Sequence, residues 1–187
     1  MIDIKLLEQL CLCNGISGDE GNVRNLIINE IKDCADDIKT DNLGNLIVFK
    51  KGKKSAKSKL MVSAHMDEVG LMVTDITSDG YLKFDEVGGI DRRVLPGKRV
   101  CVGRNGLNGV IGVKPIHLTN GDEKTAVPKM NDMYIDIGAE SREDALKYVN
   151  YGDGINFEGD FKINGKTVVT KALDAVSYTH LRAHETR

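Results

Sequence analysis

A short apolar run that ends abruptly in polar residues, Leu60–Ala64, constrains this chain more than any other feature. Its length and composition predict a buried β-strand, and His65 and Asp67 follow at its carboxyl end. In open α/β sheets, ligands and catalytic groups collect at the carboxyl ends of the strands. A histidine with an aspartate two residues later can bind a metal ion and fix the orientation of its own imidazole. The stretch therefore predicts a functional site at the end of a central strand.

The composition is that of a globular protein able to bury a core, with 41% hydrophobic and 29% charged residues in 187. The formal net charge of −2 offers no basic surface for nucleic acid or an anionic membrane. No apolar run approaches the ~18 residues that cross a bilayer, and the amino terminus lacks the layout of a signal peptide. We therefore expect a cytoplasmic protein with no nucleic-acid or membrane partner.

Two helices and a strand pair are predicted before the central strand. Apolar spacing of three to four residues predicts a helix over 4–13. The sequence Ser17–Glu20 is typical of a capping box. In such a box the serine hydroxyl accepts from the backbone N–H of the glutamate, and the glutamate side chain accepts from the backbone N–H of the serine. A second helix should therefore follow. Two short apolar runs around a turn at 41–45 predict the strand pair.

Closely spaced turn residues mark the chain after Gly70 as a β-rich segment. Short strands are predicted over 71–76, 81–87, 99–102, 110–113, 133–137 and 155–157. Such spacing is typical of a small β-barrel or a sandwich, and the sequence leaves both open. We expect an α/β domain formed by residues 1–70 and 161–174, interrupted by a β-rich insertion of residues 71–160.

Residues 175–187 differ in composition from the rest of the chain, because they are polar and show no amphipathic periodicity. We expect them to be a non-native tail, derived from an adapter or vector, and exclude them from the fold. His180 and His184 would share one face of a helix, as paired zinc ligands do, but no glutamate follows His180 as the zinc-protease motif requires. The tail is therefore interpreted as carrying no metal site.

Asp174 ends a second predicted strand in the same manner as His65. A carboxylate has two oxygens and can bridge two cations, as in hydrolases that hold paired metal ions ~3.5–4 Å apart. A lone histidine at a strand end is as often a structural residue as a ligand, and the two aspartates favour the ligand. The candidate metal ligands are thus His65 and Asp174, with Asp67 as a candidate catalytic residue beside them.

Four motifs occur in an order that resembles a known family: 63–70, Gly88–Asp91, Asp136–Glu143 and Lys171–Asp174. Together they resemble the M42 metallo-aminopeptidases, the relatives of glutamyl aminopeptidase and tetrahedral aminopeptidase. The resemblance extends over about residues 1–174, which correspond to the first half of such a protein.

The resemblance implies an α/β metallo-aminopeptidase sandwich of the phosphorylase/hydrolase-like kind, truncated here, with an inserted β-barrel dimerisation domain. It also implies peptide substrates, two divalent metal ions (zinc or cobalt) in the intact protein, and a homo-oligomer between a dimer and a dodecamer. By motif match, His65 would be a ligand of one metal, Asp174 would bridge both, and Asp67 would orient His65. A metal-bridged water would attack the first peptide carbonyl.

The chain departs from the family pattern after Asp174. The family has a second aspartate and an arginine there, whereas this chain has Ala175 and Val176. The family's later glutamate pair, a further aspartate and a last histidine are absent. Because two ligands do not hold a metal pair, we expect the chain as written to be an inactive fragment of a dinuclear aminopeptidase.

Two other functions remain open at this point. The missing catalytic residues favour a non-catalytic binding or assembly module, built on the β-rich segment. A glycosidase is suggested by names sometimes attached to the family. It requires two carboxyl groups flanking the sugar bond, and no such pair stands out from the sequence.

Overall fold

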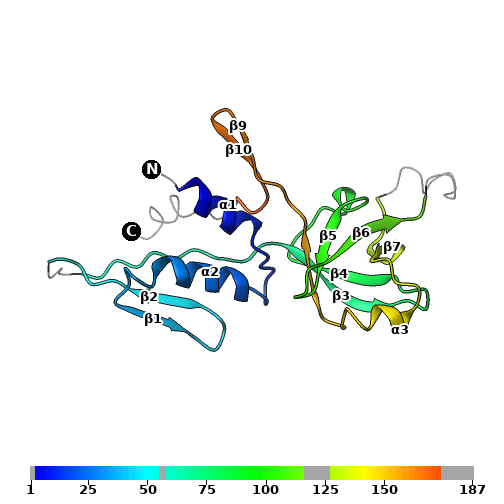
Figure 1. Ribbon diagram of the computed structural model, residues 1–187, viewed down its shortest axis with the longest axis horizontal. Coiled ribbons are helices and arrows are strands. Elements are labelled where there is room, and N and C mark those ends of the chain that lie inside the picture. The colour runs from blue at the N-terminus through cyan, green and yellow to red at the C-terminus, as the bar shows by residue number, and fades with distance from the viewer. Residues whose placement is uncertain (1–2, 55–57, 116–126, 174–187) are drawn as a thin grey trace. The chain divides into compact units, whose positions relative to one another are not determined.

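Figure 1 shows the computed structural model, which describes residues 3–54, 58–115 and 127–173. The chain divides into two compact units. One consists of Met1–Asp67 together with the chain from Gly159 onward, and the other is Glu68–Glu158. Among the described residues, no helix has both the length and the apolar character needed to cross a membrane.

The Glu68–Glu158 unit is a closed β-barrel with the strand order β3-β4-β7-β6-β5-β8. Figure 1 labels five of these strands, β3 to β7. Its strands are β3 (Gly70–Ile76), β4 (Leu82–Val87), β5 (Arg99–Val102), β6 (Leu107–Val113), β7 (Met133–Asp136) and β8 (Gly154–Phe157). All neighbouring strands are antiparallel, including β3 with β8, which closes the ring. Of the two architectures that the turn spacing left open, the structure has the barrel.

The interior of the barrel is filled by alternate residues of its strands. In β3, Leu71 and Val73 are buried while Met72 is 41% exposed. A register shift between Val73 and Asp75 then changes the alternation, so that Ile76 is buried as well. The fully buried strand residues include Leu71, Ile76, Leu82, Val100, Val102, Ile111, Met133, Ile135 and Ile155. Burying each large aliphatic side chain contributes about 1.5–3 kcal/mol, which makes this cluster the main core of the unit.

Among the described residues, short helical turns connect the barrel strands at η1 (Arg92–Val94), η4 (Met130–Asp132) and α3 (Arg142–Ala145). Ser141 caps α3 by accepting a hydrogen bond from the Asp144 N–H at 3.2 Å. α3 is a single helical turn. The carbonyl of Ala145, the last residue of α3, accepts from the N–H groups of both Tyr148 and Val149 where the chain turns toward β8.

The other unit contains α1 (Ile4–Leu12), α2 (Gly21–Ile31) and two separate hairpins. The hairpins pair β1 (Asp37–Thr40) with β2 (Leu46–Phe49), and β9 (Lys162–Asn164) with β10 (Thr167–Val169). The Asp3 carboxylate begins α1 by accepting from the N–H groups of Lys5 and Leu6. The two helices and the β1–β2 hairpin agree with the local patterns of the sequence. The strand expected to end at Asp174 ends instead at Val169, the last residue of β10.

The expectation of a buried strand over Leu60–Ala64 is wrong for the described structure. The segment belongs to no strand, and the side chains of Leu60, Met61 and Val62 are 92%, 87% and 73% exposed. A strand needs neighbours for its backbone hydrogen bonds, and the described strands of this unit pair only within the two hairpins. The larger sheet of an α/β sandwich is not formed by the described residues, so the sandwich stays a prediction.

Candidate functional site

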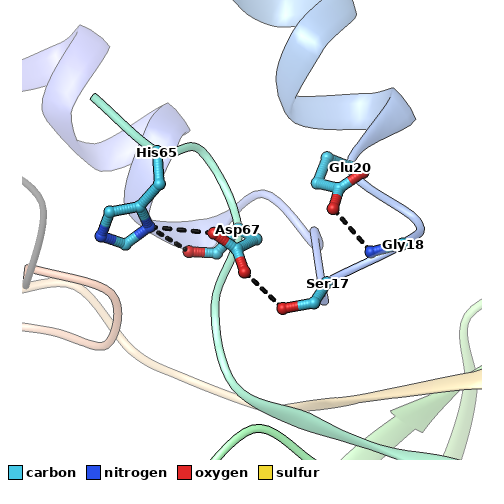
Figure 2. Close-up of polar contacts among 5 residues, drawn as sticks. All are labelled: Ser17, Gly18, Glu20, His65 and Asp67. Carbon is cyan, nitrogen blue, oxygen red and sulfur yellow. Dashed lines mark hydrogen bonds and ion pairs between the residues drawn. The ribbon is translucent and has the colours of Figure 1, made fainter. Parts of the chain in front are cut away.

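His65 and Asp67 are in direct contact in the segment that precedes β3 (Figure 2). Nδ1 of His65 lies 3.0 Å from Oδ1 of Asp67 and 3.1 Å from the backbone oxygen of the same residue. A carboxylate and a carbonyl can only accept, so Nδ1 must carry the proton. In the neutral ring, Nε2 then holds the lone pair, which is the state in which a histidine binds a metal ion through Nε2.

The second carboxylate oxygen of Asp67 accepts a hydrogen bond from the Ser17 hydroxyl (Figure 2). The Ser17 hydrogen bond is the main cause that holds the pKa of the Asp67 carboxyl below its usual value. Partial burial opposes the shift, and the contact with His65 adds to it. Asp67 is therefore an ionised carboxylate at neutral pH, bonded on one side to a hydroxyl and on the other to an imidazole.

The loop that carries Ser17 differs from the capping box that the sequence predicted. The helix α2 begins at Gly21, and its N-cap position is occupied by Glu20 without a capping side chain. Oε1 of Glu20 accepts from the Gly18 N–H at 2.6 Å, so the glutamate does reach back, but to Gly18. Because the helix starts later than the motif indicated, Ser17 lies outside it and its hydroxyl bonds Asp67 instead.

Sequence reasoning missed Ser17 as a member of the site. The capping box explained this serine locally, and its partner lies 50 residues further along the chain. A contact at that separation leaves no periodic or short-range pattern in the sequence. Only the fold brings the two residues together.

Asp174, the other candidate ligand, lies outside the described residues, as do His180, His184 and the whole tail 175–187. Lys171, three residues earlier, is described. Its Nζ lies 3.4 Å from Oδ1 of Asn14, in the loop that also carries Ser17. That loop therefore contacts both the His65–Asp67 segment and the segment that leads to Asp174.

No group of three or more His, Cys, Asp or Glu side chains that could hold a metal ion occurs within the described ranges. His65 fits the role of one ligand, because an imidazole oriented by a carboxylate is the usual arrangement around bound metals. The described residues offer no further ligands around it. A metal pair at this position stays a prediction about the intact protein.

The remaining motif residues make local contacts within the barrel. Asp91 binds the Arg93 guanidinium through both carboxylate oxygens, which lowers the pKa of Asp91 to about 2. Oδ1 of Asp136 accepts from the Gly138 N–H at 2.9 Å and fixes the turn after β7. At Asp91 and Asp136, the motif residues therefore stabilise local backbone and side-chain structure in the barrel unit.

Comparison with known proteins gives a consistent result. The model of the family described as M42 glutamyl aminopeptidase matches residues 44–177. A candidate aminopeptidase of Acetivibrio thermocellus is 48% identical over 169 residues, covering 90% of this chain and 48% of its own length. The chain thus spans about half the length of the curated relatives it matches.

Solved structures agree with the sequence relatives. The TET1 peptidase of Pyrococcus horikoshii, which can assemble into a tetrahedron or a large octahedral shell, is 43% identical with a TM-score of 0.78. A Thermotoga maritima protein named as an endoglucanase is 41% identical with a TM-score of 0.79. Both matches cover 95% of this chain and 54% of the other chain. This chain belongs to the M42 glutamyl aminopeptidase family.

Proposed function

We propose that this chain is part of an aminopeptidase that removes N-terminal residues from peptides with two divalent metal ions, zinc or cobalt. The observation that carries the proposal is the contact between His65 Nδ1 and Asp67 Oδ1 at 3.0 Å. It lies inside the region matched by the M42 family model. A histidine held in this way is prepared to bind a metal through its other nitrogen.

In the proposed site, Nε2 of His65 would bind one metal ion, and the Asp174 carboxylate would help to hold the metal pair. Metal ions bound there would act as Lewis acids and lower the pKa of a bound water. Asp67 keeps the proton on Nδ1 and holds the ring in one orientation. The His65 side chain is 48% exposed, so the ring is accessible to solvent and to an incoming ion.

We also propose a different role for each of the two units. Residues 1–70 and 161–174 would belong to the catalytic α/β domain, and the barrel-containing residues 71–160 would serve self-association. The assembly of the similar P. horikoshii peptidase into a tetrahedron or a large octahedral shell supports a homo-oligomer. We propose a size between a dimer and a dodecamer, and another similar structure is described as a dodecamer. We place the protein in the cytoplasm.

The 187-residue chain by itself is proposed to bind metal weakly and to hydrolyse little or no peptide. The proposal rests on the departure from the family pattern after Asp174, where Ala175 and Val176 stand in place of an aspartate and an arginine. Activity would require the ligands that the family carries beyond the matched half.

A hydrolysis assay tests the proposal on the intact gene product and on the 187-residue chain side by side. Both are treated with a chelator and then resupplied with Zn²⁺ or Co²⁺. We expect the intact product to cleave aminoacyl-coumarin amides with a free amino group, to spare the N-acetylated amides, and to lose activity with the chelator. Equal cleavage of free and acetylated substrates would contradict the proposal. Absence of hydrolysis by the reconstituted product would favour a non-catalytic assembly module.

A glycosidase is the second candidate, because one structural relative is named as an endoglucanase. Glycoside hydrolysis requires two carboxyl groups flanking the sugar bond. The Asp67 carboxylate is engaged through both of its oxygens, with Ser17 and with His65, which leaves it poorly suited to that role. Release of reducing sugar from carboxymethylcellulose by the chelated protein would favour the glycosidase.

A further inference from the structure

We propose that Ser17 is a positioning residue of the metal site, whose hydroxyl holds the Asp67 carboxylate in the orientation that fixes His65. The catalytic consequence rests on the proposed aminopeptidase function. The positioning itself is carried by contacts among residues that the structure describes, and it can be measured without any substrate.

The Asp67 carboxylate is held through both of its oxygens. Its two oxygens have different partners: Oδ1 accepts from His65 Nδ1 at 3.0 Å, and Oδ2 accepts from the Ser17 hydroxyl. The terminal torsion of an aspartate has a broad energy profile, so one hydrogen bond leaves the carboxylate able to rotate. Two partners on opposite oxygens define its plane, and thereby the direction from which His65 is held (Figure 2).

Ser17 is itself held by a compact turn. The Asp19 N–H donates to the Ile16 carbonyl at 2.9 Å, and Gly18 adopts a φ of +90° that favours glycine. Oε1 of Glu20 closes the loop by accepting from the Gly18 N–H at 2.6 Å. Ile16 is 5% exposed and anchors the start of the turn. The hydroxyl therefore projects from a defined backbone and not from a free loop.

A second contact brings the same loop against the His65–Asp67 segment independently of the hydrogen bond. A methyl group on Gly15 would lie 2.5 Å from Cγ2 of Val23 and 3.6 Å from the backbone oxygen of Met66. Val23 is a buried residue of α2. The loop is thus packed between α2 and the backbone between His65 and Asp67, which makes the amino-terminal helices a support for the site.

The alternative is that Ser17 only tethers the loop. The two roles are separated by what happens at His65, which Ser17 does not touch. If Ser17 only tethers the loop, removing its hydroxyl changes the stability of the loop. If Ser17 positions Asp67, removing its hydroxyl changes the tautomer and the metal affinity of His65. Threonine preserves the hydroxyl donor and alanine removes it, so the pair Ser17→Thr and Ser17→Ala isolates the hydrogen bond.

The test uses the full 187-residue chain without metal, and long-range ¹⁵N–¹H NMR of its histidine rings. The His65 signals are assigned from their loss in His65→Gln. We expect wild type and Ser17→Thr to show His65 with the proton on Nδ1, and Ser17→Ala to show a mixture of the two tautomers. Ser141→Ala is the matched control, because it removes a serine hydrogen bond from the barrel unit and should leave His65 unchanged.

The second readout is the affinity for Zn²⁺ alone, measured by competition with a chromophoric chelator on the same variants of the intact gene product, because the 187-residue chain is proposed to bind metal weakly. Loss of a group that supports a metal ligand typically costs 10- to 100-fold in affinity, and since Ser17 is exposed and water can partly replace it, we expect about tenfold. Ser17→Thr should restore the affinity. In the intact gene product, the same pair of variants should lower and restore kcat/KM.

The inference is overturned if a folded Ser17→Ala chain keeps the Nδ1-protonated tautomer and the wild-type Zn²⁺ affinity. It is also overturned if wild-type His65 is not protonated on Nδ1. Should the alanine variant fail to fold, Ser17→Gly, which also lacks the hydroxyl and adds no metal ligand, replaces it and is judged by the same two readouts. A tautomer change in Ser17→Ala together with an intact product that cleaves no peptide would support the positioning and reject the proposed function.

Discussion

Oδ1 of Asp67 lies 3.0 Å from Nδ1 of His65, a residue only two positions earlier in the chain. In a β-strand these side chains would share one face, but the segment from Leu60 to Asp67 belongs to no strand. The contact is therefore made by an irregular stretch of backbone. Its geometry depends on what holds that stretch from outside, and Ser17 supplies one such contact.

Replacing Asp67 by asparagine should weaken metal binding at His65. The carboxamide carries no charge and can present either its oxygen or its NH₂ group to the ring, so the proton is no longer confined to Nδ1. We expect Zn²⁺ affinity of the intact gene product to fall about 10- to 100-fold, measured by isothermal titration calorimetry. Asp91→Asn, the same change in the barrel, is the control and should leave the affinity unchanged. An unaltered affinity in Asp67→Asn would reject the role of Asp67.

Truncation of Leu82 to alanine should destabilise the barrel strongly. Leu82 is fully buried and pairs across the sheet with Ile135, which is also fully buried. We expect a loss of about 2–5 kcal/mol in the free energy of unfolding, because the lost contacts leave a cavity. Urea unfolding followed by tyrosine fluorescence measures it, since four of the five tyrosines lie in the barrel unit.

The control for Leu82 is Val110→Ala in β6, whose side chain is 45% exposed. Its cost should be about 1 kcal/mol or less. Equal losses for the two variants would show that the interior of the barrel is not closely packed around Leu82.

Gly80→Ala should destabilise the barrel more than Gly138→Ala does. Both glycines have left-handed φ values, +84° and +79°, so each alanine carries a backbone cost of about 1–2 kcal/mol. A methyl group at Gly80 would in addition lie 2.7 Å from the Ala139 carbonyl oxygen, whereas one at Gly138 meets nothing within 4 Å. We expect the clash to add about 1–3 kcal/mol, measured as a lower thermal midpoint. Identical midpoints would contradict the close approach at Gly80.

The Asp91–Arg93 pair should make barrel stability depend on pH only in acid. The guanidinium lowers the pKa of Asp91 to about 2 in the folded chain, against about 4 when unfolded. A lowered folded pKa contributes stability above pH 4 that is lost as the pH falls from about 4 to about 2. Arg93→Gln should raise the Asp91 pKa toward 4 in a carboxyl ¹³C titration and remove that contribution. Arg99→Gln, whose partner is Glu158, should leave the Asp91 titration unchanged.

The exposed apolar segment Leu60–Val62 should promote self-association of the isolated chain. A solvent-exposed extended apolar stretch without strand partners is a template for pairing with another chain. The double variant Met61→Glu, Val62→Glu should slow the growth of light scattering at 37 °C. The control is Val94→Glu, Val110→Glu, which adds the same charge at isolated exposed valines of the barrel unit. Equal slowing by both variants would attribute the effect to net charge and not to this segment.

The local elements could be predicted because their signals are local. The strand over Gly70–Ile76 follows from a short apolar run that is bounded by a turn. The turn before β4 follows from the sequence Ser78–Gly80, where Gly80 adopts the left-handed φ that such a turn requires. The His65–Asp67 pair was likewise predictable, because both residues lie in one short motif. Asp174 and its role as a bridging ligand stay a prediction.

What the sequence by itself determined was therefore the two amino-terminal helices, most of the short strands after Gly70, and the family. Only the tertiary structure decided that six strands close into a barrel, because the pairing of Leu71 with Ile155 joins residues far apart in the chain. Tertiary structure also decided that Leu60–Ala64 is no strand, since burial and strand pairing depend on neighbours that a local apolar run does not specify. The tertiary structure also joined Ser17 to Asp67. The periodicity of a sequence shows which face of a helix or strand is apolar. It does not show contacts between distant segments, because these depend on how the whole chain packs.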